Sequence, residues 1–401
     1  MSDNNTDILL DNAHIKRVET FKSGVFTFAI GLDLQNIQPL MDRVRDAQDR
    51  FSSVPTLPDI ATRLEKEVLV SSIYGTNTIE GGTLSEDETA KLISGEEEVK
   101  EEKQRRVTNI RSAYEKAEEF AKIIYNANVP NAAVRLQEIM FTDLHQIITD
   151  GLSDDPNNIP GHYRDNKPGE ITRVSNQEHG GEYVPPKCRD DIVMLIRAFL
   201  EWINSEEICR LSPLIRAPLV HYYFERIHPF WDGNGRVGRV LEALVLKSSG
   251  FKYAPFALSR YYLENIDEYF TVFNVARKSE EKKHPYPNTP FVEFFLKGLL
   301  MVINRLHDRI NSFVALLLYE TELMHLLNTK KINLRQYTII NNLIPAGIKH
   351  DMEEIRSKTW FKGLYLNRTE RTQYRDIKKL ADLKLIEIAP NKEIKLKITG
   401  L

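Results

Sequence analysis

The residues best suited to chemistry lie in one short stretch, HPFWDGNGRVGR, which runs from His228 to Arg239. It combines a histidine, an aspartate, three glycines and two arginines. Gly233, Gly235 and Gly238 match the fingerprint G-x-G-x-x-G, in which glycines let the backbone approach the pyrophosphate of a dinucleotide. The stretch therefore has two interpretations, a dinucleotide-binding turn or a phosphate cradle of another kind.

The residues around the glycines argue against the dinucleotide interpretation. That fingerprint follows a buried strand and precedes an acidic residue by about twenty positions. The preceding residues, SPLIRAPLVHYYFERI, have the spacing of a helix instead, and Arg216, His221 and Glu225 fall outside its apolar stripe. That stripe consists of Leu214, Ile215, Leu219, Tyr222, Tyr223 and Phe224. Leu258, and no acidic residue, lies twenty positions after Gly238.

The alternative is an anion site between a helix that ends near Ile227 and a helix that begins near Arg236. The backbone N–H groups of residues 233–235 would point at the entrance of the second helix, whose dipole favours an anion. Arg236 and Arg239 are three positions apart, so they share one helix face and can reach the same polyphosphate.

Two further side chains complete such a site. Asp232 offers one carboxylate beside the phosphates, which suits a Mg²⁺ that keeps water and phosphate oxygens as its other ligands. His228 stands at the other end of the loop, where it can take a proton from an incoming hydroxyl. A helix C-cap is the structural alternative for a histidine before proline, but the neighbouring groups favour the chemical role.

The stretch resembles the signature of Fic domain proteins, H-P-F-x-[DE]-G-N-G-[RK]-x-x-R, with every specified position filled. The resemblance implies transfer of AMP from ATP to a Tyr, Ser or Thr hydroxyl of a protein, with release of pyrophosphate. His228 would deprotonate the target, Asp232 would hold Mg²⁺ and Arg239 would bind the γ-phosphate. The implied cradle for the α- and β-phosphates is Gly233, Asn234, Gly235 and Arg236. Gly238 is counted with the nucleotide-binding residues, and Phe230 is expected to be an apolar peg that fixes the loop.

Other segments resemble further parts of a Fic core. Residues 160–164 (PGHYR) and 183–186 (YVPP) are similar to the two ends of a flap hairpin, which pairs with an extended segment of the target as in β-augmentation. The flap residues are expected to be Ile171, Thr172, Arg173 and Val174. Residues 258–261 and 268–270 resemble the segment that closes the adenine pocket, with Tyr269 and Phe270 as nucleotide-binding residues; ordinary helix core is the alternative for both.

A second motif lies upstream, where residues 76–81 (TNTIEG) fit the pattern [ST]-x-x-x-E-[GN] of the family's inhibitory helix. The resemblance implies that the Glu80 carboxylate forms a salt bridge with Arg239. Such a pair would occupy the place of the γ-phosphate and prevent productive binding of ATP.

Helical periodicity dominates the rest of the chain. Helices are expected at 102–125, 133–149, 189–204, 213–227, 237–249 and 263–277, followed by a long helix through Leu327. A long loop between 150 and 188 is expected to carry a β-hairpin with extended runs at 170–174 and 182–184. We therefore expect a mainly α protein with an N-terminal helical region (1–100), a Fic core (101–310), a linking helix (311–330) and a winged-helix-like domain (331–401).

The last domain is basic. Residues 331–401 contain fifteen Lys and Arg against eight Asp and Glu, a balance of +7 in a chain whose net charge is −3. The sequence predicts three helices and a hairpin around Asn391, with residues 371–379 exposing Arg371, Tyr374, Arg375, Lys378 and Lys379 above a core stripe of Ile377, Leu380 and Leu383. The segment resembles a winged helix, and DNA binding and a packing or dimerisation role are both open.

Composition sets the remaining expectations. The apolar runs are short and interrupted by charges, the first residues lack a secretory signal, and Cys188 and Cys209 are expected to be reduced, so we expect a cytoplasmic protein with no membrane contact. The predicted function is adenylyl transfer from ATP to a protein target and to the chain itself, dependent on Mg²⁺ and restrained by Glu80. The alternatives are a DNA-binding regulator that senses nucleotide and an enzyme that removes AMP. A homodimer is a further candidate partner.

Overall fold

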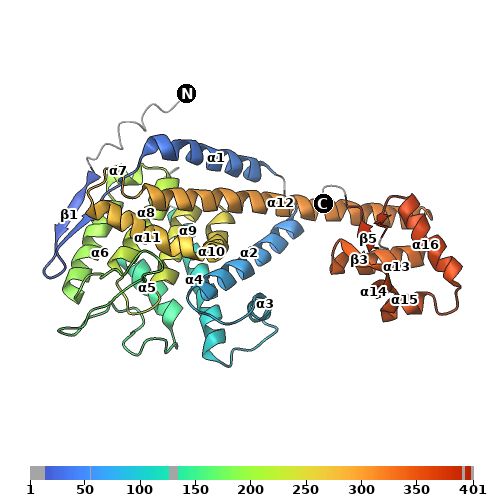
Figure 1. Ribbon diagram of the computed structural model, residues 1–401, viewed down its shortest axis with the longest axis horizontal. Coiled ribbons are helices and arrows are strands. Elements are labelled where there is room, and N and C mark those ends of the chain that lie inside the picture. The colour runs from blue at the N-terminus through green and yellow to red at the C-terminus, as the bar shows by residue number, and fades with distance from the viewer. Residues whose placement is uncertain (1–13, 55, 126–133, 391–392, 399–401) are drawn as a thin grey trace. The chain divides into compact units, whose positions relative to one another are not determined.

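The computed structural model describes residues 14–54, 56–125, 134–390 and 393–398. The described chain is mainly helical, as predicted (Figure 1). It divides into two compact units, residues 1–55 with 61–306 (unit 1) and residues 56–60 with 307–401 (unit 2). No helix among the described residues is long and apolar enough to cross a membrane.

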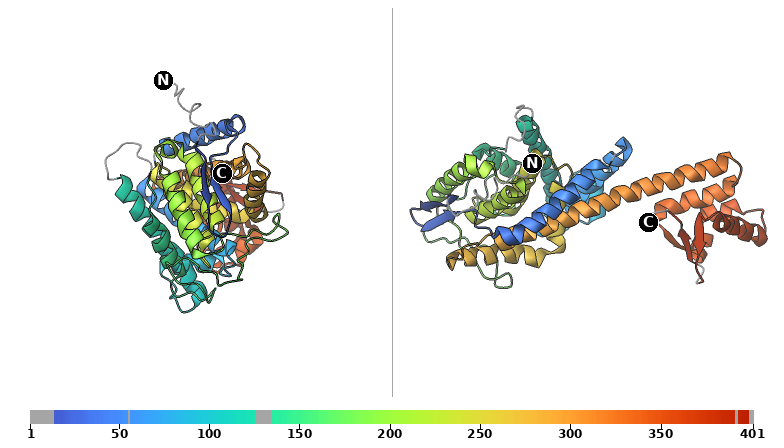
Figure 2. Two further views of the ribbon diagram at one scale, coloured as in Figure 1. Left: turned by 90° about the vertical axis from the view of Figure 1, so that its left-hand side faces the viewer. Right: turned by 90° about the horizontal axis from the view of Figure 1, so that it is seen from above.

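Unit 1 begins with a β-hairpin that the sequence analysis did not predict, because it expected only helices in the N-terminal region. Strands β1 (Lys16–Glu19) and β2 (Val25–Phe28) are antiparallel and lie against helix α6 (Figure 2). The buried Asp191 carboxylate on α6 accepts hydrogen bonds from the backbone N–H groups of Phe21 and Lys22. The turn of the hairpin is therefore anchored to the helical core.

The other elements of unit 1 are helices. They are α1 (Leu34–Ser53), α2 (Pro58–Ile79), α3 (Glu86–Ser94), α4 (Glu102–Tyr125), α5 (Glu138–Thr149), α6 (Arg189–Ile203), α7 (Glu206–Cys209), α8 (Pro213–Ile227), α9 (Asn234–Ser248), α10 (Ala254–Glu264), α11 (Ile266–Glu281) and α12 (Thr289–Asn328). Helix α2 belongs to unit 1 only from Ala61, and α12 belongs to unit 1 up to Leu306 and to unit 2 from His307. The segment expected as a separate linking helix, 311–330, is mostly the second half of α12, and the helix expected at 263–277 is divided at Asn265 between α10 and α11.

Helix α8 lies at the centre of unit 1, between α6 and α9. Ser212 caps its first turn, Pro213 occupies the first helical position, and the helix ends where His228 adopts a left-handed conformation before Pro229. Arg216 and His221 fall outside the apolar stripe that the sequence shows, and both are nevertheless fully buried. The helix is covered on all sides, so its polar side chains must find partners inside the protein.

Unit 2 contains a small antiparallel sheet with short helices. Its sheet has the order β3 (Lys349–Asp351), β5 (Glu393–Leu396), β4 (Ile386–Ile388). Its helices after α12 are α13 (Leu334–Leu343), the 3₁₀ turn η2 (Ile344–Ala346), α14 (Met352–Ser357), α15 (Thr359–Leu364) and α16 (Glu370–Asp382). Strand β3 was not predicted from the sequence, and the middle helices have other bounds than expected. The predicted hairpin tip at Asn391 lies outside the described residues.

Candidate active site

A cavity of about 470 Å³ opens in unit 1 at the loop between α8 and α9. That volume is in the range of small-molecule sites. Its walls come from this loop, the start of α9, the residue after α2, helix α11 and the segment 174–183. The predicted site residues that line it are Glu80, Val174, His228, Asp232, Gly233, Asn234, Gly235, Arg239, Tyr269 and Phe270.

His228 both caps α8 and lines the cavity, so the structural and chemical interpretations of this residue apply together. Its backbone is left-handed (φ 47°, ψ 61°), an uncommon conformation for a residue with a Cβ. The buried Arg164 guanidinium holds it there, because Nε donates to the His228 carbonyl at 2.7 Å. The His228 Nδ1 atom has no hydrogen-bond partner among the described residues, and the nearest carboxylate oxygen, on Glu225, is 3.6 Å away.

The loop between the helices is fixed from both sides by buried groups. Phe230 is fully buried, as expected for an apolar peg, and its ring stacks on His145 with centroids 3.6 Å apart. His145 Nδ1 accepts the Gly161 N–H at 2.9 Å, so its proton is on Nε2, which donates to the Asp232 carbonyl at 3.1 Å. The Asn234 side chain bonds both backbone groups of Phe230, at 3.0 and 2.9 Å.

The anion cradle is the N-terminus of α9. The helix begins at Asn234, two residues earlier than the sequence suggested. Gly233 is the N-cap, with φ 80° and ψ 0°, and no side chain caps this helix. The first N–H groups of a helix lack intrahelical partners, so this end favours an anion supplied from the cavity.

The two arginines of the stretch have different surroundings. Arg239 lines the cavity, whereas Arg236 is buried beneath the loop and pairs with Asp232 at 2.5 Å. The two guanidinium groups therefore do not face the same space in this structure, since Arg239 lines the cavity and Arg236 does not. Burial alone would raise the pKa of Asp232, but the charge and hydrogen bond of Arg236 hold it below the ordinary value.

Glu80 lies directly after α2 and forms an ion pair with Arg239, with Oε1 2.5 Å from Nη2. Thr76, one helical turn earlier, accepts from Arg239 Nε at 2.6 Å. A Cβ atom on Gly235 would clash with the Glu80 carboxylate. The glycine at this position thus lets an acidic side chain lie directly over the start of α9. Arg106 on α4 holds the Glu80 backbone through a 3.0 Å bond to its carbonyl.

The flap and base-pocket predictions have mixed outcomes. Val174 and Tyr183 form one isolated antiparallel bridge in place of a hairpin, because Ser175 turns to a φ of 69° directly after Val174. Of the four predicted flap residues, Val174 lines the cavity, and Ile171, Thr172 and Arg173 do not. Tyr269 and Phe270 line it on α11, and the Tyr269 hydroxyl accepts from Arg239 at 3.1 Å.

Several residues near the cavity were missed by the sequence analysis. Glu225, Arg226, Asn274 and Arg277 line it. Glu225 was placed outside the apolar stripe of α8, which was a usable signal for a side chain that faces a cavity. Gly238 was grouped with the nucleotide-binding residues, but it lies where α9 approaches α8: a Cβ there would be 2.8 Å from His221 Cδ2.

The residues present are compatible with one kind of metal site. The described residues contain no cluster of three or more His, Cys, Asp or Glu side chains that could hold a metal by themselves. Asp232 offers a single ionised carboxylate at the cavity wall. This donor set fits a Mg²⁺ ion shared with phosphate oxygens and water.

Comparison with known proteins connects this geometry to a family. A family model described as Fic/DOC family matches residues 135–246. A protein adenylyltransferase Fic from Drosophila erecta is 26% identical over 262 residues, which are 65% of this chain and 46% of that protein. A protein of the same name from Aedes aegypti is 28% identical over 243 residues, 59% of this chain and 43% of its own length. The chain thus spans less than half of these relatives.

Solved structures share the fold. A Fic family protein from Desulfovibrio desulfuricans G20 aligns with a TM-score of 0.53 at 20% identity, covering 91% of this chain and 97% of that one. Fic-1 from C. elegans aligns with a TM-score of 0.53 at 21% identity, covering 69% and 74%. The signature stretch lies within residues 135–246, the part of this chain that is similar to the Fic/DOC family.

Proposed function

We propose that this protein transfers AMP from ATP to a hydroxyl group of a target protein, and that Glu80 restrains the reaction. The observation that carries the proposal is the grouping of three features around one cavity. These are the His228 side chain, the uncapped start of α9 and the Arg239 guanidinium. The relatives named protein adenylyltransferase Fic support the same activity.

The residues have separate roles in the proposed step. The target hydroxyl oxygen bonds to the α-phosphorus of ATP while the bond from that phosphorus to the bridging oxygen of the β-phosphate breaks, and pyrophosphate leaves. His228 takes the hydroxyl proton. The N–H groups of Gly233, Asn234 and Gly235 hold phosphate oxygens at the start of α9, where its dipole stabilises negative charge.

Asp232 would hold Mg²⁺, which neutralises phosphate charge when bound. Arg236 does not line the cavity, so we assign it the role of orienting Asp232 through their ion pair. Arg239 binds the γ-phosphate. Tyr269 and Phe270 form part of the wall against which the nucleotide packs. Val174 lies at the target side of the cavity, where an extended segment of the target can pair with the backbone.

Restraint by Glu80 follows from competition for one guanidinium group. The Arg239 Nη2 atom, which contacts the Glu80 carboxylate, cannot contact a γ-phosphate at the same time. While Glu80 occupies Arg239, ATP lacks its γ-phosphate contact and its α-phosphorus is not held for attack.

Labelled nucleotides test the reaction type. Glu80→Gly protein is incubated with a cell lysate and with ATP labelled at the α- or the γ-phosphate. Label from the α-position in protein, with none from the γ-position, supports AMP transfer. Label from the γ-position alone would show phosphoryl transfer and contradict the proposal. Loss of AMP from a pre-labelled target, faster with wild type than with Glu80→Gly, would favour the reverse reaction, removal of AMP through Glu80.

Helix α16 supports a second activity, DNA binding by unit 2. Its acidic Asp376 is buried and accepts from Arg335, Gln336 and Tyr365, which fixes one face of the helix to α13 and to the residue after α15. The opposite face carries exposed cations with no ion-pair partner among the described residues. They are Arg371, Arg375, Lys378 and Lys379, beside the 67% exposed Tyr374. Such a face can contact phosphates.

A salt titration with duplex DNA tests this second activity. Replacing the four cations of α16 by Gln should weaken binding of the full-length protein and reduce the steepness of its salt dependence. Replacing Lys358 and Lys362 elsewhere in unit 2 is the matched control. If the α16 variant and wild type bind DNA equally, packing or dimerisation is left as the role of unit 2.

A further inference from the structure

A buried chain of hydrogen bonds runs from Arg239 into the core of unit 1. Arg239 Nη1 lies 3.1 Å from the Tyr269 hydroxyl, and that hydroxyl lies 3.1 Å from His221 Nε2. His221 Nδ1 lies 2.8 Å from Glu242 Oε2, and the Tyr262 hydroxyl bonds Glu242 Oε1 at 2.8 Å. We name the side chains of His221, Glu242, Tyr262 and Tyr269 the Arg239 relay.

The donors and acceptors of the relay fix its direction. A guanidinium group only donates, so the Tyr269 oxygen accepts from Arg239 and its single proton goes to His221 Nε2. His221 then carries its proton on Nδ1 and donates it to Glu242, whose other oxygen accepts from Tyr262. Each of these polar atoms has a partner, whereas the neighbouring Glu225 Oε1 does not.

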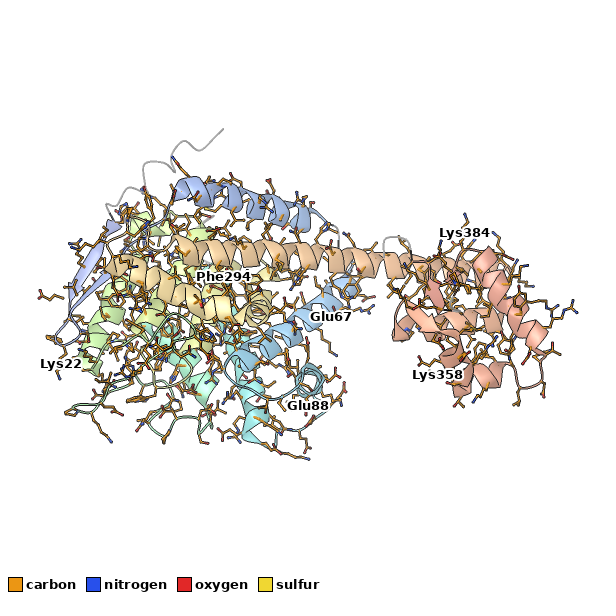
Figure 3. All side chains as sticks on the ribbon, viewed as in Figure 1. Lys22, Glu67, Glu88, Phe294, Lys358 and Lys384 are labelled. Atoms are coloured by element: carbon orange, nitrogen blue, oxygen red, sulfur yellow. The ribbon has the colours of Figure 1, made fainter. Side chains whose placement is uncertain are left out.

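The relay lies in an apolar environment that strengthens its hydrogen bonds. His221 is 0% and Glu242 1% exposed. The Tyr262 ring stacks on Tyr269 with centroids 4.7 Å apart, and Phe294, labelled in Figure 3, covers Tyr262 at 5.9 Å. Burying a histidine and a carboxylate costs desolvation energy, and apolar residues of similar size often serve stability equally well. The buried pair therefore calls for a role beyond packing.

Arg239 depends on the relay most when the N-terminal contacts are absent. Among the described residues, the side chains that accept hydrogen bonds from Arg239 are Thr76, Glu80 and Tyr269. Thr76 and Glu80 belong to the segment that restrains the site, so only Tyr269 belongs to the Fic core. When Glu80 leaves, Arg239 keeps Thr76 and Tyr269 as partners, and Tyr269 is the one that the relay holds in place.

We propose that His221 and Glu242 are positioning residues that, through Tyr269, hold Arg239 ready for the terminal phosphate of a nucleoside triphosphate. This inference rests on the proposed function. Gly238 belongs to the same device, because a side chain there would displace His221 from between α8 and α9.

The test compares the affinity of ATP with that of ADP by calorimetry, with Glu80→Gly as the parent. Glu242→Gln, Tyr269→Phe and His221→Phe are introduced into this parent. Each substitution should lower the affinity for ATP about tenfold relative to the affinity for ADP. The reason is that an Arg239 side chain no longer held in position loses a charge-assisted contact with ATP that ADP does not make. Tyr222→Phe is the matched control: it removes a buried hydroxyl of α8 that has no partner among the described residues, and it should leave the ratio unchanged.

The outcomes separate this inference from the proposed function. A thermal melt identifies any variant that fails to fold, and Tyr269→Phe, which removes one oxygen, then decides the question. If the parent prefers ATP and the relay variants keep that preference, the relay inference is wrong and the proposed function stands. If the parent shows no preference for ATP, the γ-phosphate role of Arg239 fails, and the inference fails with it.

Discussion

Removing the Glu80 carboxylate should change nucleotide affinity and stability in opposite directions. Glu80 is 24% exposed at its side chain and Arg239 only 2%, so the pair is largely shielded from water. A hydrogen bond to a charged group contributes about 1.5–3 kcal/mol. The lower figure suits a partly exposed carboxylate, and it corresponds to about tenfold in affinity.

We therefore expect Glu80→Gly to bind ATP about tenfold more tightly than wild type, with a change of about twofold or less for ADP. Without nucleotide the same variant should be less stable by about 1–3 kcal/mol, because a buried guanidinium loses its counter-ion. ATP should restore the lost stability. Calorimetric titration gives the affinities, and urea unfolding with and without ATP gives the stabilities.

Glu86→Ala is the matched control. It also breaks a Glu–Arg pair in the same segment, with Arg260, but both partners are more exposed and Glu86 does not line the cavity. Exposed pairs contribute little, so this variant should match wild type in both assays. Equal ATP affinity in wild type and Glu80→Gly, or equal gains for ATP and ADP, would refute competition between Glu80 and the γ-phosphate.

Three further outcomes are expected. His228→Ala should lower AMP transfer by about 10²–10⁴-fold with ATP affinity nearly unchanged in calorimetry, since the imidazole lies away from the phosphate cradle; a parallel loss of affinity would contradict the assignment. In the Glu80→Gly parent, Arg239→Ala should reduce the binding free energy of ATP by about 1.5–3 kcal/mol more than that of ADP. Identical losses for the two nucleotides would exclude the γ-phosphate role. Burial lowers the pKa of His145 to about 4, so its contribution to stability is complete above the unfolded pKa near 6.5 and decreases as the pH falls toward 4. When the pH is lowered from 7 to 5, the free energy of unfolding of His145→Phe should fall by about 2 kcal/mol less than that of wild type, as measured by urea unfolding. Equal decreases would show that His145 is not held neutral.

The sequence predicted most of the site because its chemistry is local. A histidine, an aspartate, glycines and an arginine at fixed spacing lie between two helices, and helix geometry alone brings residues 228–239 to one end of the cavity. The contact between Glu80 and Arg239 is not local, and it was found only through a resemblance. The predicted flap hairpin is reduced to one bridge, because Ser175 and nearby glycines adopt left-handed conformations that interrupt the pairing of its strands.

The features that the sequence did not predict depend on contacts between residues that are far apart in the chain. His221 falls outside the apolar stripe of α8, but the helix is covered on every side and α9 supplies Glu242 as the partner of the buried imidazole. The hairpin of β1 and β2 depends on Asp191, far away in the chain. The domain bounds at 100, 310 and 330, the homodimer and the cytoplasmic location remain predictions.

The most direct test of the central claim is a side-by-side labelling assay with ATP labelled at the α-phosphate. It compares wild type, Glu80→Gly, and Glu80→Gly combined with His228→Ala. We predict weak labelling of protein by wild type, strong labelling by Glu80→Gly and none by the double variant. Equal labelling by wild type and Glu80→Gly would contradict restraint by Glu80, and undiminished labelling by the double variant would contradict transfer through His228.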